Sequence, residues 1–330
     1  MAPRIISILS LTLIITISLL SISSTNAQLR NNFYGVSCPN LQTIVFNVMR
    51  DSVRQQPRLG ASILRLFFHD CFVNGCDGSV LLDDTPTFTG EKNALANRNS
   101  VRGFEVIDTI KTRVEAACNA TVSCGDILAL AARDGTTLLG GPSWGVPLGR
   151  RDARTASQST ANSDLPSPFA NLDTLITLFT NKGLSARDMT ALSGSHSIGL
   201  AQCFTFSQRI YNDTNIDQSF ATLRQSTCPQ DTTTGGSNLA PLDIRTPNRP
   251  LTGTNRFDNN YYQNLINRRG LLHSDQELFN NGSQDALVQL YSTNQRVFFQ
   301  DFASAMVRMG NLSPLTGTNG EIRRNCRLVN

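Results

Sequence analysis

The sequence predicts a mainly α-helical protein with two helical lobes, and three observations lead to that fold class. Apolar residues recur at spacings of three and four in many segments, which is the pattern of the buried stripe on an amphipathic helix. Alternating apolar and polar residues, typical of half-buried strands, are nearly absent. With 330 residues, 40% of them hydrophobic and 16% charged, the chain has enough apolar material for a full core.

Helical patterns follow one another along the chain. They cover residues 41–49, 61–72, 104–114, 123–133, 171–181, 185–202, 259–268, 283–291 and 294–309. Ser185 and Asp188 have the spacing of a capping box at the start of one helix. Gly270 stands where a C-terminal cap is expected after another helix.

Three long irregular stretches separate some of these helices. They are rich in Gly, Pro, Asn, Asp and Thr, and they cover residues 83–100, 135–168 and 227–256. Loops of this length inside a compact domain are usually functional or held by cross-links and ions. None has the composition of an open linker, so we expect residues 28–330 to form one domain.

The first 27 residues are typical of a secretory signal peptide. Arg4 precedes an apolar run over residues 5–22, and Thr25-Asn26-Ala27 offers the small residues that a signal peptidase requires. The apolar run is short, and Ser and Thr interrupt it too often for a membrane span. We therefore expect export, cleavage after Ala27 and no membrane association of the mature chain.

Charge and cysteine content bound the class of protein. Lys and Arg number 29 against 25 Asp and Glu, without runs of like charge, which is too small an excess for a nucleic-acid-binding surface. An even number of cysteines in an exported chain predicts four disulfides, whose pairing the sequence leaves open. A zinc or redox cluster is disfavoured because the chain has no Cys-x-x-Cys pair and only three histidines. The cysteines are Cys38, Cys71, Cys76, Cys118, Cys124, Cys203, Cys228 and Cys326.

Four Asn-x-Ser/Thr sequons agree with export. They begin at Asn119, Asn212, Asn281 and Asn311. Pro314 follows the last of them and makes it a poor acceptor.

The first candidate for chemistry is a pair of polar residues on one predicted helix. Arg65 and His69 are four residues apart, so they project from one face, which also carries Ala61, Phe68 and Phe72. Polar groups on such an apolar face need a reason, because burying them unpaired is costly. Two interpretations are open: a core histidine with a nearby salt bridge, or a catalytic pair of cation and base.

The second candidate is His196, which lies among small residues. Gly194, Ser195 and Gly199 leave room for a planar cofactor, or they let another helix pack closely against the glycines. Two lone histidines far apart in sequence suit the opposite faces of a haem better than a zinc site, which needs three or four close ligands.

Five runs of sequence then occur in a specific order. They are RLFFHDCFVNGCDGSVLL from Arg65, GEKNALAN from Gly90, DLPSP from Asp164, SGSHSIG from Ser193 and GLLHSDQELF from Gly270. Together they resemble the class III plant secretory haem peroxidases, and the match extends over residues 28–326 with all eight cysteines. The resemblance implies one haem b between a distal and a proximal lobe. It also favours the catalytic interpretation of Arg65 and His69.

By this resemblance His196 is the proximal iron ligand and His69 is the distal acid and base. Such a base would move a proton between the two oxygens of hydrogen peroxide, while Arg65 stabilises charge as the O–O bond breaks. The resemblance also makes Asn97 the acceptor for Nδ1–H of His69, with Glu91 fixing Asn97. Asp275 would in turn accept Nδ1–H of His196.

The implied reaction reduces hydrogen peroxide to water and oxidises phenolic or similar aromatic donors in one-electron steps. Donors would bind near Pro166, with Phe68 shaping the distal wall. The enzyme is expected to be a monomer. The chain ends four residues after Cys326, without the extension typical of vacuolar members, which favours the cell wall or apoplast. A wall-binding protein without turnover is the alternative, and the intact catalytic positions argue against it.

Two calcium ions are also implied, and both sets combine carboxylate, hydroxyl and carbonyl oxygens. The distal set is Asp70, Val73, Gly75, Asp77 and Ser79, for which a solvated acidic turn is the alternative. The proximal set is Ser197, Asp243, Thr246 and Asp258. This chain has Ser197 where the family usually has Thr, and residues 248–256 contain an insertion. The resemblance further pairs Cys38 with Cys118, Cys71 with Cys76, Cys124 with Cys326 and Cys203 with Cys228.

Overall fold

The computed structural model describes residues 29–231, 236–244 and 255–330. Three of the expectations above lie outside these described residues. They are the signal peptide over residues 1–27, the proximal calcium ligand Thr246 and most of the insertion over residues 248–256.

The first half of the chain forms helices whose sequences explain their burial. They are α2 (Leu41–Gln55), α3 (Arg58–Cys71), η1 (Ser79–Leu81), α4 (Phe104–Ala117), α5 (Cys124–Leu138), α6 (Gln158–Asp164) and α7 (Leu172–Asn181). Helix α5 is buried almost all round and packs against both α2 and α3. Its first turn is capped by the Ser123 hydroxyl, which accepts from the Asp126 amide. Because α3 packs against α5, α5 supports the helix that carries Arg65 and His69.

The second half continues with shorter elements. They are α8 (Ala186–Ser193), η2 (Gly194–Ser197), β1 (Leu200–Gln202), η3 (Cys203–Thr205), α9 (Ser207–Asn212), α10 (Gln218–Gln225), β2 (Leu239–Pro241), α12 (Asn260–Ile266), α13 (His273–Gln276), η4 (Glu277–Phe279), α14 (Asp285–Thr293) and α15 (Gln295–Gly310). Strands β1 and β2 are antiparallel, with Ala201 opposite Ala240. In the described residues no helix has the length and apolar character needed to cross a membrane.

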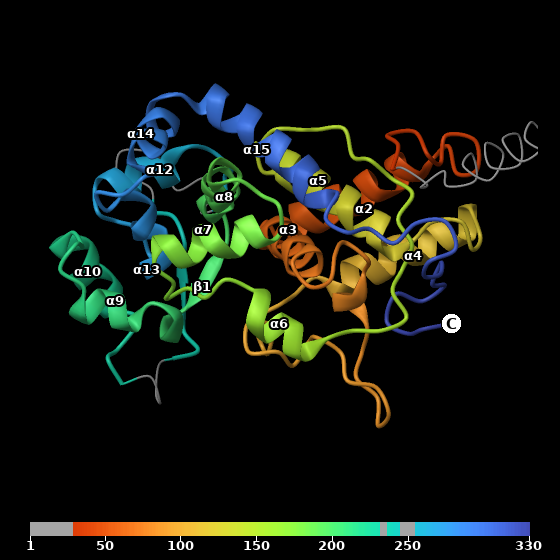
Figure 1. Ribbon diagram of the computed structural model, residues 1–330, viewed down its shortest axis with the longest axis horizontal. Coiled ribbons are helices and arrows are strands. Elements are labelled where there is room, and N and C mark those ends of the chain that lie inside the picture. The colour runs from red at the N-terminus through yellow and green to blue at the C-terminus, as the bar shows by residue number, and fades with distance from the viewer. Residues whose placement is uncertain (1–28, 232–235, 245–254) are drawn as a thin grey trace, which may run out of the picture.

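Figure 1 shows how the elements are arranged. Helices α2, α4 and α5 gather on one side, α9, α10 and α12 to α14 on the other, and α3 lies between them. Helix α15 crosses back, so the C-terminal end of the chain lies beside α4. One large apolar core extends through most of the helices, and a smaller one under β1, α9 and α10 surrounds the disulfide between Cys203 and Cys228. The fold is mainly α, as predicted.

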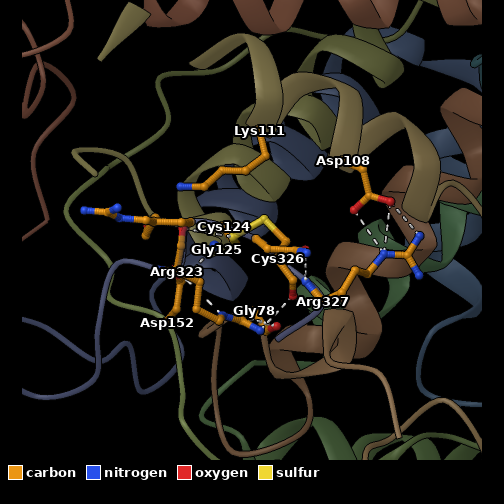
Figure 2. The surroundings of a disulfide bond; sticks show 12 residues. Gly78, Asp108, Lys111, Cys124, Gly125, Asp152, Arg323, Cys326 and Arg327 are labelled. Carbon is orange, nitrogen blue, oxygen red and sulfur yellow. Dashed lines mark hydrogen bonds and ion pairs between the residues drawn. A yellow bond between two sulfur atoms is a disulfide. The ribbon is translucent and has the colours of Figure 1, made fainter. Parts of the chain in front are cut away.

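All four disulfides join the pairs expected from the resemblance. The bond between Cys124 and Cys326 ties the C-terminal segment to the start of α5, and Figure 2 shows its surroundings. Beside it the buried Arg323 donates from Nη2 to the Gly78 carbonyl, 2.5 Å away, and from its amide to Asp152 Oδ2 at 2.9 Å. The far end of the chain therefore braces the turn that contains residues 70–79.

Two predictions about helix ends are wrong. The helix expected over residues 185–202 ends as α-helix at Ser193, becomes the 3-10 turn η2 and leads into β1. Gly199 adopts φ +102° there, which ends helical geometry. The C-terminal cap expected at Gly270 is not formed, since α12 ends at Ile266 and Arg268 takes the left-handed conformation. The capping box of Ser185 and Asp188 is confirmed.

Several short helices were not predicted. Helix α6 lies within the stretch 135–168, and α9, α10 and α13 have only four to eight residues each. Segments this short contain too few turns to display a helical period. Their side-chain caps, Ser157 on α6 and Asp217 on α10, could have signalled two of them.

Candidate active site

His69 lies near the end of α3, and its hydrogen bonds define which ring nitrogen carries the proton. Asn97 donates from Nδ2 to the Glu91 carbonyl at 2.9 Å, so its Oδ1 must face His69. His69 Nδ1–H therefore donates to Asn97 Oδ1, and the two atoms are 2.5 Å apart. The remaining nitrogen, Nε2, carries the lone pair and accepts from Arg65 Nε at 3.1 Å. The imidazole is neutral, oriented and basic at Nε2.

The pKa of His69 agrees with a neutral ring. Burial and then the positive charge of Arg65 lower this pKa to about 3, although the hydrogen bond to Asn97 opposes the shift. At neutral pH the ring is thus a proton acceptor. An ion-paired core histidine, which was the alternative, would carry the opposite charge state.

Arg65 is fixed beside His69 by several hydrogen bonds. Burial, with the nearby Arg58, lowers its pKa to about 10, although part of the side chain reaches solvent. Its guanidinium is anchored on the loop of residues 96–100 by Nη2, which donates to the Ala96 carbonyl at 2.7 Å and the Ser100 hydroxyl at 3.0 Å.

Glu91 holds Asn97 through its main-chain carbonyl and not through its carboxylate. The contact with Asn97 runs through the Glu91 main-chain carbonyl, whereas the carboxylate accepts from the Ser157 amide at 3.1 Å. Burial raises the pKa of Glu91 to about 8. The second carboxylate oxygen is buried without a hydrogen-bond partner.

His196 lies on η2 and is oriented by a carboxylate. Its Nδ1–H donates to Asp275 Oδ1 at 2.7 Å. Asp275 is buried, and its Oδ2 accepts from the Leu272 amide at 3.0 Å. The His196 side chain remains 36% exposed, so the ring keeps an open edge on which Nε2 can bind a metal.

The small residues near His196 have separate reasons. A Cβ on Gly194 would lie 2.5 Å from the Phe298 ring and from the Tyr262 hydroxyl, so close packing explains this glycine. Gly199 needs its positive φ, and a Cβ there would lie 3.3 Å from Cβ of Ala61. Ala61 lies on α3, so the segment that contains His196 comes close to the helix that carries His69. The set fits a planar iron cofactor between two imidazoles, one oriented as a base and one as a ligand.

The segment of residues 157–168 runs along the edge between the two sides. Asn162 Oδ1 accepts from the Leu95 amide at 2.7 Å on the distal side, and the Pro168 carbonyl accepts from the Ser274 amide at 3.0 Å on the proximal side. Pro166 is half-buried between these anchors. Phe68 is half-buried next to His69, with its ring against Phe72.

The distal turn gathers buried oxygen atoms. Asp70, Asp77 and Ser79 are all buried, and the Ser79 hydroxyl lies close enough to the carboxylates of Asp77 and Glu91 to lower the pKa of both. Burial and the Asp77 charge raise the pKa of Asp70, and burial raises that of Asp77 to about 6. Gly75, with φ +120°, brings the backbone of this turn within reach of the Ser313 carbonyl. Two crowded carboxylates beside a buried hydroxyl fit a hard cation better than a solvated turn.

The proximal oxygen atoms meet at the start of α12. Asn260 donates from Nδ2 to both oxygens of Asp243, at 3.1 and 2.9 Å, and from its amide to Asp258 Oδ1 at 3.0 Å. The Ser197 hydroxyl is buried without a partner. Within the described residues no three His, Cys, Asp or Glu side chains form a metal cluster. A calcium site with two carboxylates completed by hydroxyl and carbonyl oxygens does not need one.

Sequence reasoning missed several residues that hold this site. Ser100 and the Ala96 carbonyl anchor Arg65, Ser157 binds Glu91, and Tyr261 donates to Asp275 Oδ1 at 3.0 Å. The partners are 14 to 66 residues apart in the chain, and two of the contacts involve the backbone. No local pattern marks such residues. The four sequon asparagines are all exposed.

Comparison with known proteins gives consistent matches. The family model described as peroxidase matches residues 45–294. Peroxidase P7 of Brassica rapa subsp. rapa is 58% identical over 303 residues, which cover 92% of this chain and 100% of the relative. Peroxidase 4 of Vitis vinifera is 55% identical, covering 93% and 94% of the two chains. Peroxidase 22.3 of Oryza sativa subsp. japonica is 55% identical over 330 residues, the full length of both.

Proposed function

Because this chain belongs to the peroxidase family, as a class III haem peroxidase of the plant type, we propose that Arg65, His69 and His196 carry its reaction with hydrogen peroxide. One haem b, when bound between the two histidines, would supply the iron on which peroxide binds and the capacity to store two oxidising equivalents. His196 would hold that iron through Nε2, with Asp275 keeping its Nδ1 proton.

His69 moves the proton. Its Nε2 lone pair would take a proton from one oxygen of hydrogen peroxide and deliver it to the other, outer oxygen. That oxygen would leave as water with the electron pair of the O–O bond, and this reduction would consume two electrons supplied by the bound haem. Asn97 holds the Nδ1 proton throughout, so only Nε2 exchanges protons with the substrate. The observation that carries this proposal is the pair of hydrogen bonds that fix both nitrogens of His69.

Arg65 hydrogen-bonds to this base at rest and assists it during the reaction. Its Nε–H occupies the His69 Nε2 lone pair in the resting arrangement, so peroxide must displace that contact before the proton can transfer. The released guanidinium then donates to the outer oxygen as negative charge develops there. The anchors on the loop of residues 96–100 limit this movement to a small one.

Small phenols are the proposed electron donors. They would approach the edge formed by Pro166 and Phe68, which are both half-buried. The oxygen-rich turns at Asp70 and at Asp243 would each hold one calcium ion, which orders the distal and proximal sides. Residues 28–330 would form a monomeric domain, secreted to the cell wall after cleavage at Ala27.

Haem-loaded mature protein tests this function. Mixing with hydrogen peroxide should change the visible absorption within milliseconds to seconds, and p-cresol should then be oxidised at the expense of peroxide. Protein that holds haem but neither reacts with peroxide nor oxidises phenols would contradict the proposal. Terminal analysis of the exported protein should find a chain that begins at Gln28.

A further inference from the structure

We propose that Tyr261 is a positioning residue that sets how strongly Asp275 attracts the Nδ1 proton of His196. The proposal rests on the proposed function, in which His196 binds iron. Tyr261 touches neither peroxide nor the donor. It would act through a carboxylate that it shares with the iron ligand.

The geometry places both donors on one atom. Asp275 Oδ1 accepts from His196 Nδ1 at 2.7 Å and from the Tyr261 hydroxyl at 3.0 Å. The other oxygen, Oδ2, accepts from the Leu272 amide. Tyr261 and Asp275 are both 2% exposed, so water cannot replace a lost donor easily.

The Tyr261 ring is also fixed against the ligand. It stands edge-on to the His196 imidazole, with ring centroids 6.1 Å apart and planes at 86°. Helix α12, which carries it, packs against η2, the turn that contains His196. The hydroxyl therefore has one defined partner and little freedom to choose another.

The sign of the effect follows from charge sharing. A carboxylate oxygen that accepts two hydrogen bonds has less negative charge for each of them. Without the Tyr261 hydroxyl, Asp275 Oδ1 would pull the His196 proton more strongly and make the imidazole more anionic. A more anionic ligand donates more electron density and stabilises the oxidised iron. Tyr261 would thus raise the reduction potential that Asp275 lowers.

The main test is the reduction potential of haem-loaded Tyr261→Phe. We expect a shift to more negative potential and a higher iron–imidazole stretching frequency. Tyr262→Phe is the matched control, because Tyr262 is equally buried on the same helix but donates to the Thr190 carbonyl at 2.8 Å instead. It should leave both measurements unchanged.

A double-mutant cycle separates this role from a structural one. Asp275→Asn should shift the potential positively, and Tyr261→Phe in that background should have a much smaller effect than in the wild type. Equal shifts in both backgrounds, or none in either, would overturn the role of Tyr261. If Asp275→Asn itself leaves the potential unchanged, the proposed iron ligation by His196 fails as well, so the two failures can be distinguished.

A second perturbation covers the case in which Tyr261→Phe does not hold haem. Wild-type protein produced with 3-fluorotyrosine has more acidic, stronger donating hydroxyls. Its reduction potential should shift to a more positive value. The shift should persist when Tyr262→Phe is also produced with 3-fluorotyrosine. A potential that does not move with the fluorinated residue contradicts the proposal.

Discussion

One side-chain amide decides which nitrogen of His69 can act as the base. Asn97 is oriented by the Glu91 carbonyl, and it in turn leaves Nε2 as the ring nitrogen that carries the lone pair. On the proximal side Asp275 accepts the Nδ1 proton of His196 in the same way, but with a carboxylate oxygen in place of an amide oxygen. The two histidines are therefore proposed to have different electronic roles, because their Nδ1 partners differ.

The first prediction concerns the distal base. His69→Ala should retain haem, because the proposed iron ligand His196 is untouched, but should react with peroxide about 10²-fold or more slowly, as expected for a lost general acid and base. Stopped-flow mixing with peroxide measures this rate. His273→Ala is the control, since it removes a half-exposed histidine paired with Asp213 and should keep the wild-type rate. A near-normal rate for His69→Ala would refute the assignment.

The second prediction concerns the pKa of His69. Because the positive charge of Arg65 helps to lower this pKa to about 3, Arg65→Gln should raise it. The peroxide rate of the wild type should stay flat down to about pH 4, since the base remains neutral there. In Arg65→Gln the rate should begin to fall at a higher pH, besides being lower throughout. Coincident acid limbs in the two pH profiles would count against the electrostatic role of Arg65.

The turn of residues 70–79 fixes the end of α3 and gathers buried oxygen atoms there. The Ser79 hydroxyl lies close to the carboxylates of Asp77 and Glu91 and lowers the pKa of both.

The third prediction concerns this hydroxyl. Ser79→Ala should lower the calcium affinity, because it removes one of the oxygen atoms proposed to hold the ion. Thermal unfolding at graded free calcium measures this affinity. Ser304→Ala, which removes an exposed hydroxyl on α15, is the control and should leave the calcium affinity unchanged. An unchanged calcium affinity in Ser79→Ala would show that the hydroxyl does not hold the ion.

Helix α8 carries the chain into η2, and its start depends on Asp188. Burial alone would raise the pKa of Asp188, but hydrogen bonds from Arg308 and Ser185 outweigh this and lower it. The ionised carboxylate accepts from Arg308 Nε at 2.8 Å and from the Ser185 amide at 3.0 Å.

The fourth prediction is a pH-dependent loss in Asp188→Asn. A carboxylate whose pKa is lower in the folded than in the unfolded protein stabilises the fold at pH values above the unfolded pKa of about 3.9. This stabilisation disappears as the pH falls through the folded pKa. Asp188→Asn should therefore unfold with about 1–2 kcal/mol less free energy at pH 7. The difference from the wild type should shrink below about pH 4. Urea unfolding at both pH values tests this, with the exposed Asp173→Asn as control; a difference that does not depend on pH would contradict it.

The C-terminal segment contacts several elements that lie much earlier in the chain. The C-terminal segment reaches α5 through the disulfide at Cys326, the distal turn through Arg323, and α4 through Arg327, whose Nη2 lies 2.7 Å from Asp108 Oδ2. The disulfide between Cys124 and Cys326 joins residues 202 apart, whereas that between Cys71 and Cys76 joins residues 5 apart.

The fifth prediction compares these two disulfides. In the chain-entropy model, loss of the long-range bond costs about 5 kcal/mol and loss of the short one about 2 kcal/mol. Replacing both cysteines of each pair by serine should therefore lower the urea midpoint more for the long-range pair. Calcium should be absent from these measurements, since the short pair also braces the distal turn. Equal midpoints would mean that the unfolded chain gains little freedom from opening the long loop.

The sequence alone was sufficient to predict the class of fold, the helices with several turns and the two histidines, because these depend on local spacing and on motifs that a linear chain displays. It also determined the capping box of Ser185 and Asp188, whose partners are three residues apart. Short helices such as α9 and α13 and the end of α8 at Ser193 lay beyond it, since they form where packing allows rather than where a period demands.

Contacts that form only in the folded protein determine which residues hold the side chains of the site in place. The contacts of Ser157 with Glu91, of Ser100 with Arg65 and of Tyr261 with Asp275 join residues that are distant in the chain. Hydrogen bonds of this kind depend on where folding brings a donor and an acceptor within 3 Å or so, and no spacing in the sequence encodes that meeting. The sequence therefore names the groups that would perform the chemistry, while the fold chooses the partners that set their protonation and orientation.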